Sequence, residues 1–428
     1  MDRPAATSTT ESPAVNSVVI VGGGLAGLST AQELRRRSFA GSVTIVDREG
    51  FPYDRPPLSK AYLHPGATAA SLALVDQTWY AENDVHVLHA DVDAIDPGDT
   101  RVNLQSGRTL GADRIVLATG GRPRPLGVPG SDHPEIHYLR SRSDADRIRK
   151  YLGPGRRVLI AGAGLIGAEL ASTAVAQGTD IIVVDPAPIP LAPAVGEELA
   201  VLLHSMHSEA GVQCVHGSVS SVERSEMTWV ATVHRGPTLD DLNVKCDAIV
   251  VAIGILPDTE LAQRAGLEVN GGVIVNDLHQ TSSPTIFAVG DAARHKAADG
   301  TLAKSHEHWE SAATDGRRAA AAIQGETPDP PGAPWFWSDR YGVHVEVVGS
   351  MTGPGHTVVR QPGQAVGRSE SSAPWAAFRV QDSTLLGCAT VDDAMSVRAA
   401  RRIIERGIHV DIEALASATA TDLRRLAR

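Results

Sequence analysis

Short apolar runs alternate with segments of helical periodicity along most of the chain. Residues 18–21 form the first apolar run, a glycine-rich turn follows at 22–27, and apolar residues recur at helical spacing over 28–34. The next apolar run covers residues 43–46. Such alternation is typical of βαβ units with parallel strands, so the pattern predicts an α/β fold.

The same arrangement occurs a second time. The apolar run 158–161 leads into a second glycine-rich turn at 162–167. Both turns fit G-x-G-x-x-G between a predicted strand and a predicted helix, and each following strand ends on an acid, Asp47 or Asp185. The glycines permit a tight turn, close approach to a pyrophosphate and close helix–strand packing, while the acid binds ribose hydroxyls. Two such units predict two bound dinucleotides.

Further patterns complete these units and add a third region. A proline-rich stretch at 327–334 indicates a domain boundary. Beyond it, alternating segments at 343–347 and 377–380 suggest an antiparallel sheet, and residues 395–406 suggest an amphipathic helix. Before it, strands are predicted at 114–118, 248–254 and 285–291, and a helix at 141–150.

The composition is that of an ordinary globular protein. The chain has 428 residues, of which 42% are hydrophobic and 21% charged, and its formal net charge is −11. The length predicts two or three domains. The negative charge argues against non-specific binding to nucleic acid or acidic membranes, but leaves open a local basic patch for an acidic partner. No apolar stretch predicts a transmembrane helix. Residues 1–17 lack the apolar core of a signal peptide and predict a disordered tail.

The cysteines and histidines do not form a recognisable metal or disulfide pattern. The three cysteines, Cys214, Cys246 and Cys388, are scattered and include no C-x-x-C pair, so we expect a reducing, cytoplasmic location. His295, His306 and His308 lie close in sequence, but without a metal-ligand spacing. We therefore predict no metal site.

Six blocks of sequence, taken in this order, resemble the FAD-dependent NAD(P)H:ferredoxin reductases that serve cytochrome P450s and ring-hydroxylating dioxygenases. The blocks at 52–60 (PYDRPPLSK) and 333–339 (APWFWSD) are the most specific ones. The others are 22–27, 118–125, 162–167 and 287–291. The resemblance covers essentially the whole chain after Ser17.

This resemblance implies a glutathione-reductase-like fold, with two Rossmann-like dinucleotide-binding domains and a C-terminal α+β domain. An FAD-binding domain is expected at 18–122 and 247–326, interrupted by an NAD-binding domain at 123–246, and the C-terminal domain at 327–428. Distant strands would complete the first unit, including the strand that ends at Asp291.

The resemblance also implies which residues bind the two cofactors. Asp185 is followed by residues 186–191, which carry no positive charge, so NADH is expected in preference to NADPH. Taken singly, Arg55, Arg140 and Trp309 could equally be surface or packed residues. The implied FAD contacts are Gly22, Gly24, Ala26, Gly27, Asp47, Arg55, Lys60, Val92, Ala118, Thr119, Gly120, Arg140, Asp291 and Trp309. The implied NAD contacts are Gly162, Gly164, Leu165, Ile166, Gly167, Glu169, Asp185 and Gly254.

The expected reaction is hydride transfer from NADH to the flavin, followed by single-electron transfer to an iron–sulfur ferredoxin. Holding the two rings together supplies most of the rate, so no side-chain nucleophile is required. The resemblance implies that Lys60 lies near flavin N5, that Glu169 reaches toward the nicotinamide, and that the two form an ion pair across the domain junction. A plain helix residue is the alternative for Glu169.

Two further pairs are expected to contact the ferredoxin. Trp335 and Trp337 are candidates for the face between flavin and partner, with the C-terminal core as their alternative. Arg317 and Arg318 could form a basic docking patch. The alternative for these two arginines is an ordinary solvated helix face.

The same fold also serves other functions, which are alternatives for this chain. Disulfide, coenzyme A-disulfide and peroxide reductases need a redox cysteine near the flavin, and residues 51–60 and the region around Gly120 contain none. An NADH:rubredoxin reductase would use the same flavin chemistry. An NADH-responsive signalling flavoprotein of the apoptosis-inducing-factor kind is a different class, which should sustain turnover with one-electron acceptors poorly. The sequence leaves a monomer and a homodimer equally open.

Overall fold

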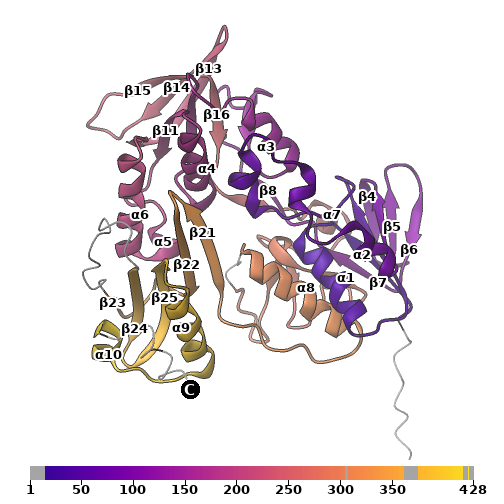
Figure 1. Cartoon of the computed structure of the whole chain (residues 1–428). Coiled ribbons are helices and arrows are strands. Elements are labelled where there is room, and N and C mark those ends of the chain that lie inside the picture. The colour runs from indigo at the N-terminus through magenta and orange to yellow at the C-terminus, as the bar shows by residue number, and fades with distance from the viewer. Residues whose placement is uncertain (1–14, 304–306, 361–374, 418–422, 424–428) are drawn as a thin grey trace, which may run out of the picture.

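Three lobes make up the molecule (Figure 1). The computed structural model describes residues 15–303, 307–360, 375–417 and 423, so most of the expected N-terminal tail lies outside the described residues. We call residues 15–122 with 255–326 the first lobe, 123–254 the second lobe and the described part of 327–428 the C-terminal lobe. None of the helices in the described part of the chain has the length and apolar character needed to cross a bilayer.

The first lobe is built on a five-stranded parallel sheet with strand order β19-β7-β1-β2-β3. Its last strand comes from far along the chain, since Ile286 pairs with Ile115, which confirms that distant strands complete the first unit. Helices α1 and α8 pack closely together against one face. The sheet strands are β1 (Ser17–Val21), β2 (Ser42–Asp47), β3 (Val85–His89), β7 (Arg114–Leu117) and β19 (Ile286–Ala288), and the helices are α1 (Leu25–Arg36), α2 (Gln77–Glu82), α7 (Glu260–Arg264) and α8 (Trp309–Ile323).

The second lobe repeats this plan, with strand order β12-β11-β10-β16-β9. Ile249 of β16 pairs with Leu159 of β10. The expected start of the returning FAD-binding segment at residue 247 is therefore wrong, because β16 is a central strand of the second sheet. The strands are β9 (Ile136–Tyr138), β10 (Arg157–Ala161), β11 (Asp180–Asp185), β12 (Gln213–His216) and β16 (Ala248–Val251), and the helices are α3 (Arg142–Arg149), α4 (Leu165–Ala176), α5 (Ala192–Val195) and α6 (Glu197–Glu209).

The chain passes between these two lobes twice. The two connecting strands, β8 (Gly121–Pro123) and β17 (Ile255–Pro257), pair with each other antiparallel. Each parallel sheet is also covered on its other face by a three-stranded antiparallel sheet. These small strands are β4 (Val92–Asp96), β5 (Arg101–Leu104) and β6 (Thr109–Gly111) in the first lobe, and β13 (Ser218–Ser225), β14 (Thr228–His234) and β15 (Leu242–Cys246) in the second. The strands β18 (Val273–Val275) and β20 (Ala293–His295) form a further pair.

The two nucleotide lobes share an unexpected detail at the acid that ends the second strand. Asp47 pairs in register with His89, and Asp185 with His216. Each histidine places Nε2 within hydrogen-bond distance of the carbonyl oxygen of the residue after the acid, 2.9 Å from Arg48 and 3.0 Å from Pro186. The internal duplication of the glycine turns therefore extends to the third strand of each sheet.

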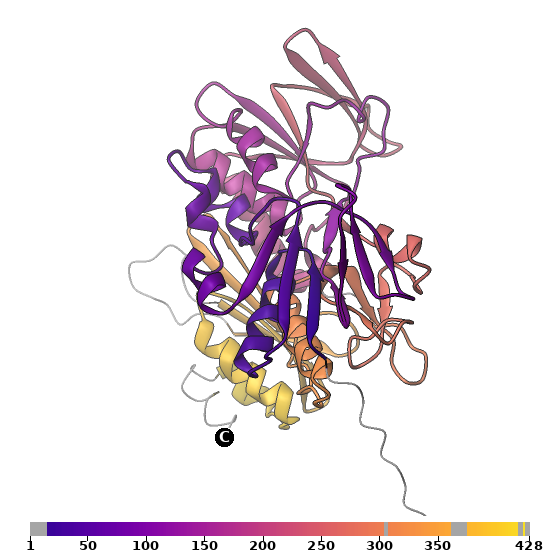
Figure 2. The ribbon, with the colours of Figure 1, turned by 90° about the vertical axis from the view of Figure 1, so that its right-hand side faces the viewer.

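The C-terminal lobe is an antiparallel sheet with strand order β21-β22-β25-β24-β23. One face packs on α9, and the other packs on α5 and α6 of the second lobe, so the C-terminal lobe is anchored to that lobe. Figure 2 turns the first lobe toward the viewer, with the yellow helix α9 below it. The elements are β21 (Trp335–Arg340), β22 (Val343–Gly349), β23 (His356–Arg360), β24 (Trp375–Gln381), β25 (Thr384–Val391), α9 (Ala394–Arg406) and α10 (Ile412–Ser417), which agrees with the expected antiparallel sheet and amphipathic helix.

One segment of the first lobe packs across the junction. Residues 51–72 contain three short 3₁₀ helices, η1 (Pro56–Ser59), η2 (Ala61–Leu63) and η3 (Ala69–Leu72). Their apolar side chains, including Leu58 and Leu63, belong to the core that covers the second sheet. This packing places the end of η1 beside helix α4, and it decides where Lys60 lies.

Candidate functional site

The two glycine turns have the backbone that a dinucleotide site requires. Gly22 and Gly162 have φ of +110° and +107°, and a Cβ atom at either one would lie 2.2 Å or 2.4 Å from a carbonyl oxygen of the neighbouring strand end. Gly24 and Gly164 are the N-cap residues of α1 and α4, and neither helix has a side-chain cap. Both helix N-termini can therefore direct backbone N–H groups and a positive dipole end at a phosphate.

The two acids bind the turns themselves. The Oδ2 atom of Asp47 accepts a hydrogen bond of 2.7 Å from the Gly23 N–H, and that of Asp185 accepts one of 2.7 Å from the Ala163 N–H. In each case Oδ1 accepts a second bond from a backbone N–H two residues further on. These bonds fix the carboxylates beside the turns. Their contact with a ribose stays a prediction.

A cleft of about 1250 Å³, a volume that includes open solvent at its mouth, lies where the three lobes meet. Most of the expected FAD contacts line it, together with residues of α4 and of β21. The expected residues along it are Gly24, Ala26, Arg55, Lys60, Ala118, Thr119, Gly120, Arg140, Leu165, Ile166, Glu169, Asp291, Trp309 and Trp337. The cleft is also lined by residues for which the sequence predicts no role, namely Tyr53, Asp54, Ser59, Glu307 and Phe336.

The remaining expected contacts lie outside this cleft. Val92 begins β4 and packs against the apolar core beneath the small antiparallel sheet, so the structure gives it a packing role. Val92 does not line the cleft, so its contact with FAD stays a prediction. Also away from the cleft lining are Gly22, Gly27 and Asp47 of the first lobe, and Gly162, Gly164, Gly167, Asp185 and Gly254 of the second.

The wall of the cleft beside the first glycine turn carries two arginines, Arg55 and Arg140, together with the carboxylates of Asp291 and Glu307. Arg140 donates from Nη2 to Asp291 Oδ2 at 2.7 Å, and Arg55 donates to the Arg140 carbonyl oxygen at 3.3 Å. Burial, and then the neighbouring charge of Arg140, lowers the pKa of Arg55. In the described part of the chain the buried Nε of Arg140 has no hydrogen-bond partner. A buried donor without a partner is costly, so this wall fits an anionic ligand such as the pyrophosphate of FAD.

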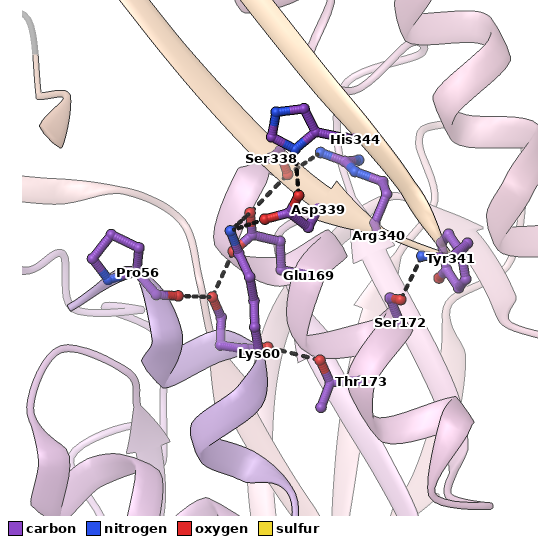
Figure 3. A network of polar contacts seen from close by, with 11 residues as sticks. Pro56, Lys60, Glu169, Ser172, Thr173, Ser338, Asp339, Arg340, Tyr341 and His344 are labelled. Carbon is purple, nitrogen blue, oxygen red and sulfur yellow. Dashed lines mark hydrogen bonds and ion pairs between the residues drawn. The ribbon is translucent and has the colours of Figure 1, made fainter. Parts of the chain in front are cut away.

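A network of polar side chains crosses the cleft from the first lobe to the C-terminal lobe (Figure 3). The expected ion pair is present, with Lys60 Nζ 3.3 Å from Glu169 Oε1. Lys60 Nζ also lies 2.8 Å from Asp339 Oδ2, which is a closer contact. Asp339 belongs to the sequence block 333–339, but the sequence predicts no role for it.

Glu169 is held by donors from two lobes. Its side chain is 7% exposed. Ser59 donates to Oε2 at 2.5 Å, and Ser338 donates to Oε1 at 2.7 Å. Arg340, which is also buried, donates from Nη2 to Ser338 Oγ at 3.1 Å. A buried carboxylate needs such partners, because an uncompensated charge in the interior is strongly unfavourable. The alternative of Glu169 as a plain helix residue is therefore wrong.

Three tryptophans form a contiguous cluster beside Lys60. Trp337 has its ring centroid 5.4 Å from Lys60 Nζ and stacks on Trp335 with centroids 5.2 Å apart. Trp309 meets Trp337 edge-on at 5.8 Å and is 37% exposed. Trp335 also packs against the C-terminal core. The core interpretation of Trp335 is therefore confirmed, and its contact with a partner stays a prediction.

Comparisons with known proteins agree with this architecture. A family model described as "pyridine nucleotide-disulphide oxidoreductase" matches residues 16–316. The chain belongs to this family. A second model, "reductase C-terminal", matches residues 335–427.

Several characterised relatives share nearly the whole chain. Putidaredoxin reductase of Pseudomonas putida is 34% identical over 413 residues, covering 92% of this chain and 93% of that protein. Rhodocoxin reductase of Rhodococcus erythropolis is 32% identical, covering 91% and 89%. A rubredoxin-NAD(+) reductase of Pseudomonas putida is 33% identical, covering 78% and 87%.

Solved structures show the same fold. The reductase in a covalent putidaredoxin reductase–putidaredoxin complex has a TM-score of 0.87 at 32% identity, covering 97% of this chain and 99% of that chain. An NAD-dependent persulfide reductase from A. fulgidus has a TM-score of 0.81 at 21% identity, covering 94% and 79%, which shows the fold alone.

The cysteines of this family member lie away from the cleft. Cys214, Cys246 and Cys388 are all free thiols, and none of them is among the lining residues. Burial raises the pKa of all three thiols, to about 12 for Cys246. Because the thiolate is the reactive form, these cysteines are poorly suited to redox chemistry, and none could reach a ligand in the cleft directly.

The two arginines expected to dock a partner differ from each other. Arg317 is exposed and donates to Thr314 Oγ1 at 2.9 Å. Arg318 donates to the carbonyl oxygens of Asp277 and Asp329, and its Nε lies 3.4 Å from His279 Nε2. The guanidinium of Arg318 thus holds loops of its own chain together, and its role in docking stays a prediction.

His295, for which no metal site is predicted, lies near another histidine and a carboxylate that are distant in sequence. His295 and His279 each place Nε2 3.9 Å from Asp315 Oδ1. His308 instead stacks on Phe336, and His306 lies outside the described residues. The positive charge of Arg318 beside His279 opposes a cation at this place. This charge agrees with the prediction that no metal binds here, which stays a prediction.

Proposed function

We propose that this protein is an FAD-containing NADH:ferredoxin reductase. It takes a hydride from NADH and passes single electrons to an iron–sulfur ferredoxin, which feeds a cytochrome P450 or a ring-hydroxylating oxygenase. The observation that carries the proposal is the Lys60–Glu169 pair, which joins the two nucleotide lobes in a cleft away from the cysteines. The named activities of putidaredoxin reductase and rhodocoxin reductase support it.

The first lobe would hold FAD and the second NADH. FAD, when bound, accepts a hydride and releases its electrons one at a time. Arg55 and Arg140 bind the anionic part of the cofactor, because their guanidinium groups line the same wall as the first helix N-terminus. Lys60 supplies a fixed positive charge where negative charge develops. Glu169, held by two serines, keeps the Lys60 ammonium in place.

NADH is favoured over NADPH by Asp185. Its carboxylate is fixed beside the second glycine turn by two backbone N–H groups. In that position it binds ribose hydroxyls and repels a 2′-phosphate. No cation occurs among residues 186–191 to offset this repulsion.

Electrons would leave through the tryptophan cluster of Trp309, Trp335 and Trp337 toward a partner docked beside it. The exposed Arg317 on α8 supplies positive charge for an acidic ferredoxin, which raises the encounter rate. The named activity of the rubredoxin-NAD(+) reductase makes rubredoxin the second candidate acceptor. The free thiols favour a reducing, cytoplasmic location.

Anaerobic titration of the purified protein tests the proposal. We expect a yellow protein whose visible flavin band bleaches quickly with NADH and slowly with NADPH. Steady reduction of a ferredoxin, compared with a rubredoxin at equal concentration, then identifies the acceptor class. A colourless protein, or a flavin that stays oxidised with NADH, would contradict the proposal. Rapid bleaching without turnover on any one-electron acceptor would favour the signalling flavoprotein.

A further inference from the structure

Each of the two nucleotide lobes carries a histidine at the same place in its parallel sheet. His89 ends β3 and is paired in register with Asp47, and His216 ends β12 and is paired in register with Asp185. The residue after each histidine donates its backbone N–H to the carbonyl oxygen of the acid, at 3.1 Å in the first lobe and 3.0 Å in the second. The backbone therefore fixes both histidines in equivalent positions beside the acids.

Both imidazoles are also held in the same way. The Nε2 atom of His89 lies 2.9 Å from the carbonyl oxygen of Arg48, and that of His216 lies 3.0 Å from the carbonyl oxygen of Pro186. A carbonyl oxygen can only accept, so Nε2 carries the donated proton. In a neutral imidazole held like this, Nδ1 keeps its lone pair and can only accept a hydrogen bond.

The acceptor atom of each imidazole is open to a ligand. Both histidine side chains are exposed. Within the described parts of the chain, the hydrogen bond of each ring is the one made by Nε2, and neither Nδ1 atom receives a donor. Each lobe thus presents a fixed, exposed acceptor next to the carboxylate that is expected to bind a ribose.

The order of the strands shows what would reach this acceptor. In the first lobe the glycine turn follows β1, the acid ends β2 and the histidine ends β3, and these three strands are neighbours in the sheet. Strands β10, β11 and β12 repeat this order in the second lobe. Neighbouring strands lie about 4.8 Å apart. A dinucleotide with its pyrophosphate at the turn and its ribose at the acid therefore carries its base toward the histidine.

We propose that His89 and His216 determine base specificity, by accepting a hydrogen bond at Nδ1 from the 6-amino group of adenine. The inference rests on the proposed function, which puts FAD in the first lobe and NADH in the second. Because the flavin and nicotinamide halves would extend into the cleft beside Lys60, the base near each histidine is adenine. Hypoxanthine carries an oxygen in place of the amino group, and two acceptors that face each other do not bind.

A purely structural role is the alternative for both histidines. Each imidazole holds the residue after the ribose-binding acid through Nε2, and loss of that bond would weaken the binding of any dinucleotide. Such a loss would affect adenine and hypoxanthine cofactors equally. The ratio of the two affinities therefore separates recognition of the base from support of the fold.

Calorimetry on the FAD-loaded protein tests His216, with NAD+ and nicotinamide hypoxanthine dinucleotide as the two probes. The wild type should bind NAD+ about two- to tenfold more tightly, the range for one neutral hydrogen bond. H216F keeps a planar ring without the nitrogen atoms, and should bind both probes equally. H216N places an amide oxygen near the position of Nδ1, and should recover the preference. The exposed His234 on β14 gives a matched control, since H234F should keep the wild-type ratio.

The first lobe provides an independent test on the same protein. The holoenzyme is equilibrated with an excess of flavin hypoxanthine dinucleotide, and the fraction of FAD that is replaced is measured. H89F should exchange its FAD about two- to tenfold more readily than the wild type, and H216F should behave as the wild type. H89F should in turn keep the wild-type preference for NAD+. His86, which is exposed on the same strand, gives the control variant H86F.

An unchanged base preference in H216F or in H89F would overturn the inference for that lobe. A wild-type protein that binds adenine and hypoxanthine dinucleotides equally well would overturn it for both. If one of the two variants fails to fold, the variant in the other lobe decides. A protein that binds neither FAD nor NAD+ would instead refute the proposed function, so the two failures are distinguishable.

Discussion

Lys60→Met tests whether the charge between Glu169 and Asp339 serves the chemistry or only the fold. The substitution keeps most of the length of the side chain near Trp337, but removes the ammonium. If Lys60 stabilises negative charge that develops during hydride transfer, flavin reduction should slow sharply while the protein stays folded. If Lys60 only joins the lobes, stability should fall and the rate should not.

The structure gives the size of each effect. Glu169 would lose Lys60, but it would keep hydrogen bonds from Ser59 and Ser338 and the nearby Arg340. The loss of stability should therefore be about 1–3 kcal/mol, the range for a buried group that loses one partner. Removal of one preorganised group that stabilises developing charge lowers a rate by roughly 100- to 1000-fold. A slower flavin reduction in a protein that stays folded can therefore be distinguished from a loss of stability alone.

Stopped-flow mixing with saturating NADH under anaerobic conditions measures the reduction step alone. We expect K60M to reduce its flavin roughly 100- to 1000-fold more slowly than the wild type, and K60R, which keeps the charge, to recover most of the rate. Thermal unfolding and the FAD content of each variant serve as controls. A folded, FAD-loaded K60M protein that reduces its flavin at a rate within a few-fold of the wild type would refute the reasoning.

Four other outcomes are expected. D185S should raise KM for NADH about tenfold and improve the use of NADPH, measured by steady-state kinetics with both cofactors. R317E should slow ferredoxin reduction, most strongly at low salt, and leave flavin reduction by NADH unchanged, with equal slowing of both steps as the contrary result. Burial lowers the pKa of His207 from 6.5 to about 4, so the unfolded chain binds more protons between these values and about 3 kcal/mol of stability is lost as pH falls through them. Denaturant unfolding of H207Q over this range should show a shallower pH dependence. G316A should destabilise the first lobe by about 1–3 kcal/mol, because its Cβ would lie 2.4 Å from the Ala26 carbonyl oxygen, and unchanged thermal stability would contradict this.

The error at residue 247 shows where sequence reasoning stopped. The apolar run at 248–251 correctly predicted a buried strand. The resemblance puts this strand in the FAD-binding domain, yet Ile249 pairs with Leu159 and belongs to the second lobe. An apolar run is equally suited to the middle of either parallel sheet, and the choice depends on pairing between residues far apart in the chain.

The segment 51–72 is a second case of the same kind. Its sequence block was recognised as specific, and Lys60 was correctly expected to pair with Glu169. Nothing local in it indicates that Leu58 and Leu63 pack in the core of the second lobe. That packing is what brings Ser59 and Lys60 to α4.

The two dinucleotide-binding units can be predicted from the sequence, because their glycines, strand ends and acids are local requirements of backbone geometry. Gly22 and Gly162, with positive φ and a carbonyl oxygen in the place of a Cβ, meet those requirements. The contact of Lys60 with Asp339, unlike its pair with Glu169, follows only from how the lobes pack. Asp339 and His344 come from strands nearly three hundred residues away in the chain, and only the packing of the C-terminal sheet on α5 and α6 brings them to the cleft. Long-range contacts of polar side chains have no periodic signature, so their partners are fixed only once the lobes have packed together.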